Sequence, residues 1–256
     1  MLKTRAAPRR DREGTEAVRR GTTPAGARSE EQAAAWVRDM FGRVAPRYDL
    51  LNHLLSANVD RYWRGRTVRR VSDILSRTDA VCLDLCCGTG DLMFALRKRA
   101  ACRVLGSDFC HPMLVAARAK RHCDVFEADA LRLPVRDRSL DLITVAFGFR
   151  NLANYRRGME EMLRVLKPGG TAAIVEFSQP RNRTFAAMYN FYSRHVLPAI
   201  GGLISGSREA YTYLPESVRR FPGAAELAEQ MRAAGFREVE YERMTGGIVA
   251  LHIARA

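Results

Sequence analysis

The sequence predicts an α/β protein with a doubly wound, mostly parallel sheet of seven strands. Short apolar runs alternate with helical stretches over residues 80–177, a glycine-rich turn follows the first run, and two more strand-like runs lie near the C-terminus. A helix between two strands carries the chain back across the sheet, so this alternation favours parallel pairing.

The expected strands are short apolar or alternating runs bounded by turn residues. They cover residues 80–85, 103–107, 140–147, 172–177, 237–243 and 248–254, with a short one ending before Glu127. The expected helices cover residues 91–99, 112–121, 155–166, 185–205 with a bend at Pro198, and 224–234. The last two strands are joined through Gly246 and Gly247.

The N-terminal region divides into two parts. Residues 1–29 are rich in Arg, Gly, Pro, Thr and Glu and hold almost nothing to bury, so we expect a disordered basic tail. Acids within it, such as Asp11, argue against a mitochondrial presequence. Residues 30–77 carry apolar side chains at helical spacing, with a break at Pro46, and predict helices that cover a site as a lid.

Charge and cysteine content limit the class of protein. The chain of 256 residues has a formal net charge of +14, which suits nucleic acid, an anionic membrane surface or a plain solvated surface. None of the six cysteines forms a C-x-x-C pair, so we expect reduced cysteines in a cytoplasmic protein and no metal. No apolar run reaches membrane-spanning length.

A glycine turn after the first strand is the strongest motif. Asp84 lies in that strand, and Gly88-Thr89-Gly90 leads into the next helix, a geometry that lets backbone approach a ligand closely. A dinucleotide site would need a third glycine where Met93 stands. The turn therefore favours a mononucleoside without a pyrophosphate.

Two acidic positions extend this nucleoside pattern. Asp108 ends the second strand, where a carboxylate can accept hydrogen bonds from both ribose hydroxyls. Asp129 and the backbone amide of Ala130 follow the third strand and can bind an adenine edge. Three such elements in order, each at a strand end, favour a nucleoside site over coincidence.

The combined motifs resemble a class I S-adenosylmethionine methyltransferase, and more closely the UbiE/MenG/COQ5 family of quinone biosynthesis. Two specific runs carry the resemblance, Tyr48-Asp49-Leu50-Leu51-Asn52 and Phe147-Gly148-Phe149-Arg150-Asn151. The resemblance implies a Rossmann-like fold with S-adenosyl-L-methionine as methyl donor and no metal. It makes residues 30–256 one methyltransferase domain, in which residues 30–77 form the lid and residues 185–234 a helical insertion over the substrate.

Two positions depart from the family pattern. Asp60 and Arg61 stand where the family often has a histidine, which puts a general role for that histidine in doubt. Ala146 stands where a serine often precedes the Phe-Gly pair, and this change should weaken one cofactor contact without abolishing the site.

The implied reaction is C-methylation of a prenylated quinol, with demethylmenaquinol as the leading substrate and menaquinol as product. The benzoquinol of ubiquinone biosynthesis and another lipid-like molecule are alternatives of the same chemistry. An RNA methyltransferase and a non-catalytic nucleoside-binding protein are alternatives of other classes. No RNA-binding module is recognisable, so we expect no nucleic-acid partner.

The expected catalytic residues are Arg150, Asn151, Asp49 and Tyr48. Arg150 follows the fourth strand, where a guanidinium would stabilise a developing phenolate, although it could equally pair with a carboxylate to lock the loop. Asp49 could act as a base or as a helix N-cap. The expected cofactor-binding residues are Asp84, Gly88, Thr89, Gly90, Asp108, Asp129, Ala130 and Phe147.

The expected partners follow from a substrate that lives in a membrane. The apolar helix over residues 185–205 could line a slot for an isoprenoid tail, and His195 within it is interpreted as a packing residue. An arginine cluster could be a solvated face or could contact anionic lipid at the inner face of the membrane. Its members are Arg61, Arg64, Arg66, Arg69 and Arg70. A homodimer is left open.

Overall fold

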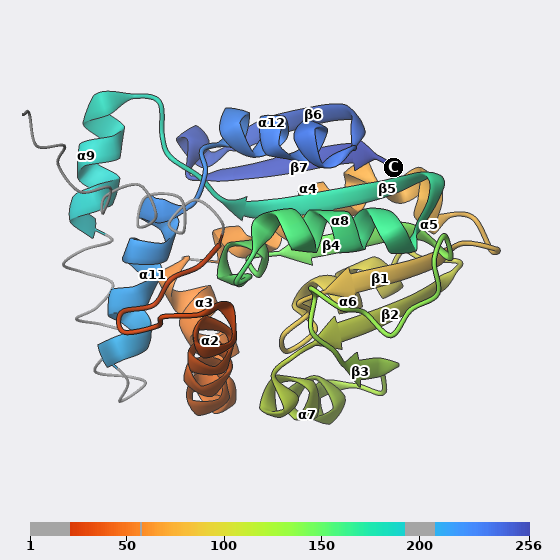
Figure 1. The fold of residues 1–256 in the computed structure, drawn as a ribbon, viewed down its shortest axis with the longest axis horizontal. Helices are drawn as coiled ribbons and strands as arrows, with labels where there is room; N and C mark the ends of the chain where they lie inside the picture. Colours follow the sequence, from red (N-terminus) through yellow and green to blue (C-terminus); the bar gives the residue numbers. More distant parts are fainter. Residues whose placement is uncertain (1–20, 57, 193–207) are drawn as a thin grey trace, which may run out of the picture.

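Seven strands form one sheet in the order β3-β2-β1-β4-β5-β7-β6 (Figure 1). The structure is a computed structural model that describes residues 21–56, 58–192 and 208–256. The strands are β1 (Val81–Leu85), β2 (Arg103–Asp108), β3 (Val125–Glu127), β4 (Leu140–Ala146), β5 (Leu166–Phe177), β6 (Arg237–Met244) and β7 (Val249–Arg255). β7 runs antiparallel to both of its neighbours, and the other pairings are parallel. The predicted doubly wound, mostly parallel sheet is confirmed.

Helices cover both faces of this sheet. Those that follow the sheet's strands are α6 (Asp91–Arg97), α7 (His111–Lys120), α8 (Tyr155–Val165), α9 (Arg183–Phe191), α11 (Arg208–Arg220) and α12 (Ala224–Ala234). α8 and α12 bury apolar side chains against one face, and α6 and α7 against the other. Within β1, Leu83 and Leu85 join the first cluster while Cys82 joins the second. Since both faces are covered, the central strands β1 and β4 are mainly apolar, as the sequence indicated, whereas the edge strand β6 carries charged residues.

The strand order places a crevice between β1 and β4. From β1 the chain moves outward to β2 and β3, then returns to β4 on the other side of β1. In open α/β sheets a ligand binds at the carboxyl ends of the strands where the order reverses. The loops after β1, β2 and β4 therefore form the candidate site.

Residues 30–77 are helical, as predicted. They form α2 (Glu30–Val44), η1 (Ala45–Arg47), α3 (Tyr48–Leu55), α4 (Val59–Arg70) and α5 (Ser72–Leu75). Ser29 caps α2, because its Oγ accepts a hydrogen bond from Gln32 N at 3.2 Å. The expected break falls at Pro46, within η1. That these helices act as a lid stays a prediction.

The last part of the expected tail contacts the rest of the protein. Residues 1–20 lie outside the described residues, but Thr22 is already buried and its backbone N donates to Leu152 O at 2.8 Å. Gly21 lies so close to this loop that a Cβ would stand 2.0 Å from Ala153 O. The contact is made by backbone and by a small residue, so the low apolar content of the segment did not indicate it.

The region before β6 differs in part from expectation. α9 ends at Phe191, and residues 193–207, with Pro198 and His195, lie outside the described residues. α11 lies within the predicted helical insertion over residues 185–234, but its own bounds were not predicted, and Pro215 lies inside it. α12 covers residues 224–234, as expected. Among the described residues no helix is long and apolar enough to cross a bilayer.

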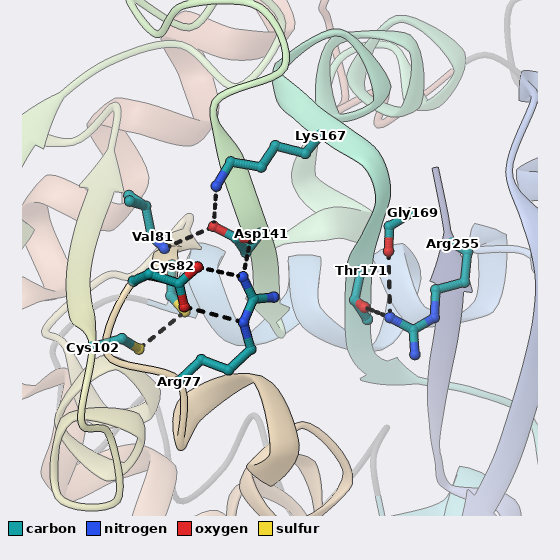
Figure 2. Close-up of polar contacts among 10 residues, drawn as sticks. Arg77, Val81, Cys82, Cys102, Asp141, Lys167, Gly169, Thr171 and Arg255 are labelled. Atoms are coloured by element: carbon teal, nitrogen blue, oxygen red, sulfur yellow. Dashed lines mark hydrogen bonds and ion pairs between the residues drawn. The ribbon is translucent and has the colours of Figure 1, made fainter.

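Asp141 anchors the sheet at the edge opposite the site (Figure 2). Its carboxylate accepts hydrogen bonds from Val81 N at 3.0 Å and Lys167 Nζ at 2.6 Å, and pairs with Arg77 at 3.2 Å. It therefore joins the first residues of β1, β4 and β5. Burial disfavours ionisation, but the hydrogen bonds from Lys167 and Val81 and the two positive charges outweigh it, so the pKa of Asp141 lies below its ordinary value.

We expect Asp141→Ala to lower the free energy of unfolding at neutral pH by about 1–3 kcal/mol, because a buried amide and two cations lose their partner. A depressed pKa means that this stabilisation is lost as the pH falls through the folded-state value, so parent and variant should converge in acid. Urea titrations of parent and variant at neutral pH and at acid pH measure the difference in the free energy of unfolding. Asp79→Ala is the control, since the Asp79 side chain is 73% exposed beside Arg77. Equal losses for the two variants would contradict the anchor.

Candidate active site

A turn with left-handed backbone follows β1 and opens the crevice. Cys86, Gly88 and Gly90 have φ of 54°, 55° and 86°. At Gly90, directly before α6, a Cβ would also lie 2.8 Å from the Phe94 ring. Conformation and space both require glycine here, so a ligand can approach the backbone of the turn.

Asp108 ends β2 and braces this turn. Its Oδ2 accepts a hydrogen bond from Gly88 N at 2.8 Å and its Oδ1 from Cys110 N at 2.9 Å. The side chain nevertheless lines the first of two cavities at this edge. A carboxylate oxygen can accept two hydrogen bonds, so capacity for hydroxyl donors remains on both oxygens. This arrangement fits the ribose of a nucleoside.

We expect ligand affinity to depend on the protonation of Asp108. Burial raises the pKa of Asp108 to about 6. A hydroxyl donor prefers the ionised form, so we expect affinity for the methyl donor to fall as the pH drops below about 6. Calorimetry across this range should show the fall for the parent and a flat profile for Asp108→Asn. Asp84→Asn is the control: burial also raises the pKa of Asp84, to about 7, but Asp84 does not line the slot. This variant should therefore keep the parental fall in affinity. A flat parental profile would contradict the role of Asp108.

The first cavity is lined by most of the predicted cofactor residues. It is a narrow slot between the strand ends and the N-terminal helices. Predicted residues that line it are Tyr48, Gly88, Asp108, Asp129, Ala130, Phe147 and Asn151. Ala146, the departure from the family's serine, also lines it. The predicted nucleoside pattern is therefore brought together in one place.

Three predicted cofactor residues lie behind the slot and do not line it. Asp84 is buried and its Oδ1 accepts a hydrogen bond from Thr144 Oγ1 at 2.6 Å. Thr89 Oγ1 donates to Asp49 Oδ1 at 2.5 Å, and Gly90 starts α6. These residues shape the turn from behind.

Asp49 is held away from both cavities. Besides Thr89, it pairs with Lys120 Nζ at 2.5 Å, and Lys120 in turn pairs with Asp91 at 2.9 Å. Neither cavity is lined by Asp49. Asp49 thus links α3 to the glycine turn and to Lys120 of α7.

The second cavity is larger, and eight of its lining residues are aromatic. Its volume is about 620 Å³, and its aromatic lining residues are Phe41, Tyr48, Trp63, Phe147, Phe177, Tyr189, Tyr192 and Tyr213. Phe147 has a φ of 59° and lines both cavities. Its ring centroid lies 5.7 Å from that of Trp63 and 5.0 Å from that of Phe177. Phe41 and Tyr48 also line both cavities, so three aromatic side chains lie between the two spaces.

Arg150 lines the second cavity and is also paired. Its Nη1 donates to Glu176 Oε1 at 3.0 Å, its backbone N donates to Glu176 Oε2 at 3.1 Å, and its guanidinium lies 5.2 Å from the Phe177 ring centroid. Burial opposes the charge, but Glu176 more than offsets it, so the pKa of Arg150 lies above its ordinary value. Nε has no hydrogen-bond partner among the described residues. Arg150 therefore forms the ion pair that was one interpretation from the sequence. It also lines a cavity, as the other interpretation, stabilisation of a phenolate, requires.

Glu176 is the residue that sequence reasoning missed. It is 1% exposed and precedes the last residue of β5. An acid inside an otherwise apolar run, near the carboxyl end of a central strand, is the signal that could have identified it. At the departure from the family's histidine, Asp60 accepts a hydrogen bond from Ser56 Oγ at 2.6 Å, pairs with Arg64 and lines the second cavity.

The family of the chain follows from comparison with known proteins. The model of the ubiE/COQ5 methyltransferase family matches residues 27–256. The chain belongs to this family. It is therefore an S-adenosylmethionine-dependent C-methyltransferase of quinone biosynthesis, as the motifs predicted.

Curated relatives cover most of the chain. A Thermus thermophilus protein named demethylmenaquinone methyltransferase is 48% identical over 84% of this chain and 98% of its own. A Deinococcus radiodurans protein of the same name is 46% identical over 85% and 91%. A Syntrophotalea carbinolica protein named ubiquinone/menaquinone biosynthesis C-methyltransferase UbiE is 42% identical over 84% and 92%.

Solved structures share the fold at low identity. A SAM-dependent methyltransferase from Aquifex aeolicus has a TM-score of 0.53 at 19% identity, covering 74% of this chain and 88% of its own. The [4+2]-cyclase SpnF has a TM-score of 0.62 at 19% identity, covering 91% and 98%. Since one of these two is a cyclase, the activity rests on the family match, and the structural likeness shows the fold alone.

Proposed function

We propose that this protein methylates a ring carbon of demethylmenaquinol to give menaquinol. One observation carries the proposal: the second cavity meets the slot lined by Asp108 and Gly88 at three shared aromatic side chains, Phe41, Tyr48 and Phe147. A flat ring held among aromatic side chains would thus lie beside the donor site. The names of the Thermus and Deinococcus relatives support a naphthoquinol as the acceptor.

The acceptor in this proposal is the reduced quinol. S-adenosylmethionine supplies, when bound, a methyl group on a positively charged sulfur, which an electron-rich carbon can accept. A quinone ring is electron-poor, whereas loss of a phenolic proton from the quinol places negative charge on the oxygen and the adjacent ring carbon. The protein must therefore favour that charge, hold the ring in place and keep water out.

Arg150 is the residue that we propose stabilises the phenolate. Its guanidinium lines the cavity, is buried, and has one N–H without a partner among the described residues. Glu176 fixes its orientation from one side. In a site of low polarity such a preorganised cation stabilises a developing charge more than it would in water.

Tyr48 and Asn151 complete the proposed set. Tyr48 lines both cavities, and burial raises the pKa of its hydroxyl, which therefore keeps its proton and can donate a hydrogen bond. Asn151 lines the slot near Phe147. Both are placed to orient bound molecules where the two cavities meet.

Turnover by the purified protein tests the proposal. With S-adenosylmethionine and short-tailed demethylmenaquinol under reducing conditions, we expect the methylated naphthoquinol as product. The oxidised quinone should give none. The corresponding benzoquinol, the alternative acceptor, should react more slowly. Preference for the benzoquinol would overturn the choice of ring, and turnover of neither would overturn the proposal.

We also propose that the protein meets an anionic membrane surface through helices that line the second cavity. Three of the five α4 arginines are engaged within the protein: Arg66 pairs with Glu242 at 2.7 Å, Arg70 pairs with Glu240, and Arg64 is buried. Arg61 and Arg69 are exposed. Exposed apolar side chains lie on α3, α4 and α9. They are Leu50, Tyr62, Met188 and Phe191, exposed by 61%, 53%, 62% and 64%. A net charge of +14 adds attraction to anionic lipid.

Met188→Glu with Phe191→Glu should lower binding to vesicles of mixed anionic and neutral lipid several-fold, since two apolar contacts are replaced by negative charge. Co-sedimentation at fixed salt measures this. Val115→Glu is the control, because Val115 is 50% exposed on α7, away from α9 (Figure 1). Equal binding by the double variant and the parent would contradict the surface.

A further inference from the structure

A chain of hydroxyl groups connects the N-terminal segment to the donor slot. Tyr213 on α11 is 8% exposed, and its Oη donates to Asn151 Oδ1 at 2.9 Å. Thr22 Oγ1 lies 2.7 Å from the same Oη. The Tyr213 ring packs against Trp36, with centroids 5.0 Å apart, independently of its hydroxyl. The chain therefore runs from a residue expected in a tail to a residue that lines the slot.

The number of protons available for donation fixes which group donates and which accepts in each of these hydrogen bonds. A phenol has one proton, and an amide oxygen can only accept, so Tyr213 donates to Asn151 and Thr22 must donate to Tyr213. Burial raises the pKa of Tyr213, so the hydroxyl keeps the proton that it donates. Asn151 Nδ2 then faces Phe147 O at 3.5 Å. The reversed amide would place its oxygen against that carbonyl oxygen, acceptor against acceptor.

Thr22 is held in place by its own neighbours. The strap, defined as residues 21–24, crosses the loop between η2 (Phe149–Asn151) and α8, where Thr22 N donates to Leu152 O at 2.8 Å. Arg220 Nη1, at the end of α11, donates to Thr23 O at 2.8 Å. The strap is thus fixed to both elements that the hydroxyl chain joins.

We propose that Thr22 and Tyr213 are positioning residues for the methyl-donor site: together they fix the orientation of the Asn151 amide, which lines the slot. Loss of the Tyr213 hydroxyl frees this amide to rotate, while the ring packing stays. The strap is then a part of the methyl-donor site, although its composition is typical of a disordered tail. The inference rests on the proposed function only in taking the slot as the donor site.

Calorimetry with S-adenosylmethionine tests the inference without any quinol. Tyr213→Phe should weaken donor affinity about three- to tenfold, as expected for one lost hydrogen bond in a buried chain. Thr22→Val should weaken it about two- to threefold, and Thr22→Ser should restore it. Tyr241→Phe on β6 and Thr23→Val in the strap are the matched controls, and both should bind donor as the parent does.

A double-mutant cycle separates positioning from a general structural effect. In an Asn151→Ala background, Tyr213→Phe and Thr22→Val should have no further effect on donor affinity, because the amide they position is absent. Unchanged affinity in folded Tyr213→Phe, or equal losses with and without Asn151, would overturn the inference. If Tyr213→Phe does not fold, the Thr22 cycle decides it alone. Because no quinol is present, failure here leaves the proposed acceptor untouched, and failure of quinol turnover leaves this cycle interpretable.

Discussion

Arg150→Ala should lower the single-turnover rate of methyl transfer by about two to three orders of magnitude, the usual cost of removing a preorganised group that stabilises transition-state charge. The quinol oxygen gains its charge only as the proton leaves, so the guanidinium stabilises that state more than the neutral quinol. Donor affinity should stay near the parental value, because Arg150 lines the second cavity and not the slot. Rapid-quench measurement and calorimetry give the two quantities.

The Arg150–Glu176 pair needs its own controls. Removing the arginine leaves a buried carboxylate, so part of any loss could come from altered packing. Arg150→Lys keeps the charge but not the planar fork and should recover only part of the rate. Arg66→Ala breaks an ion pair with Glu242 outside the cavities and should leave the rate unchanged. A folded Arg150→Ala with the parental rate would make Arg150 a structural ion pair only.

Asp108→Ala should weaken donor affinity by at least an order of magnitude. Two charge-assisted hydrogen bonds to the ligand would be lost, and the Gly88 and Cys110 amides would lose their acceptor as well. Calorimetry measures the affinity, and thermal unfolding shows whether the variant is folded.

Asp124→Ala is the matched control for Asp108. Asp124 lies just before β3, and its side chain is 54% exposed beside Arg103. Its removal should change donor affinity little. A folded Asp108→Ala that binds donor as tightly as Asp124→Ala would show that this carboxylate only braces the turn.

The type of sheet and the edge at which its loops meet were predictable, because they follow from local patterns. Apolar runs, a glycine turn and carboxylates at strand ends fix which loops meet at one edge, so Asp108, Asp129 and Gly88 were expected together and line one slot. Side-chain pairing across that edge was not predictable. Glu176 and Arg150 come from different strand ends, and Asp49 meets Thr89 and Lys120 from two other elements. Their distances depend on loop conformations that periodicity does not encode.

The contacts of the N-terminal segment were hidden for a different reason. Thr22 contacts the body through a backbone amide and a hydroxyl, and Gly21 through close backbone approach. The apolar content of a segment indicates neither its hydrogen bonds nor a close approach of its backbone. The bounds of α11 were not predicted either, and this helix continues through Pro215. Composition and propensity detect burial of apolar groups and regular backbone, and these two features depend on other interactions.

The most direct test is the quinone content of the host from which the gene has been removed. The account predicts that demethylmenaquinone accumulates and menaquinone disappears. The parental gene should restore menaquinone, and the Arg150→Ala gene should not. Unchanged menaquinone in the deletion strain, with no other enzyme of this family present, would contradict the assignment.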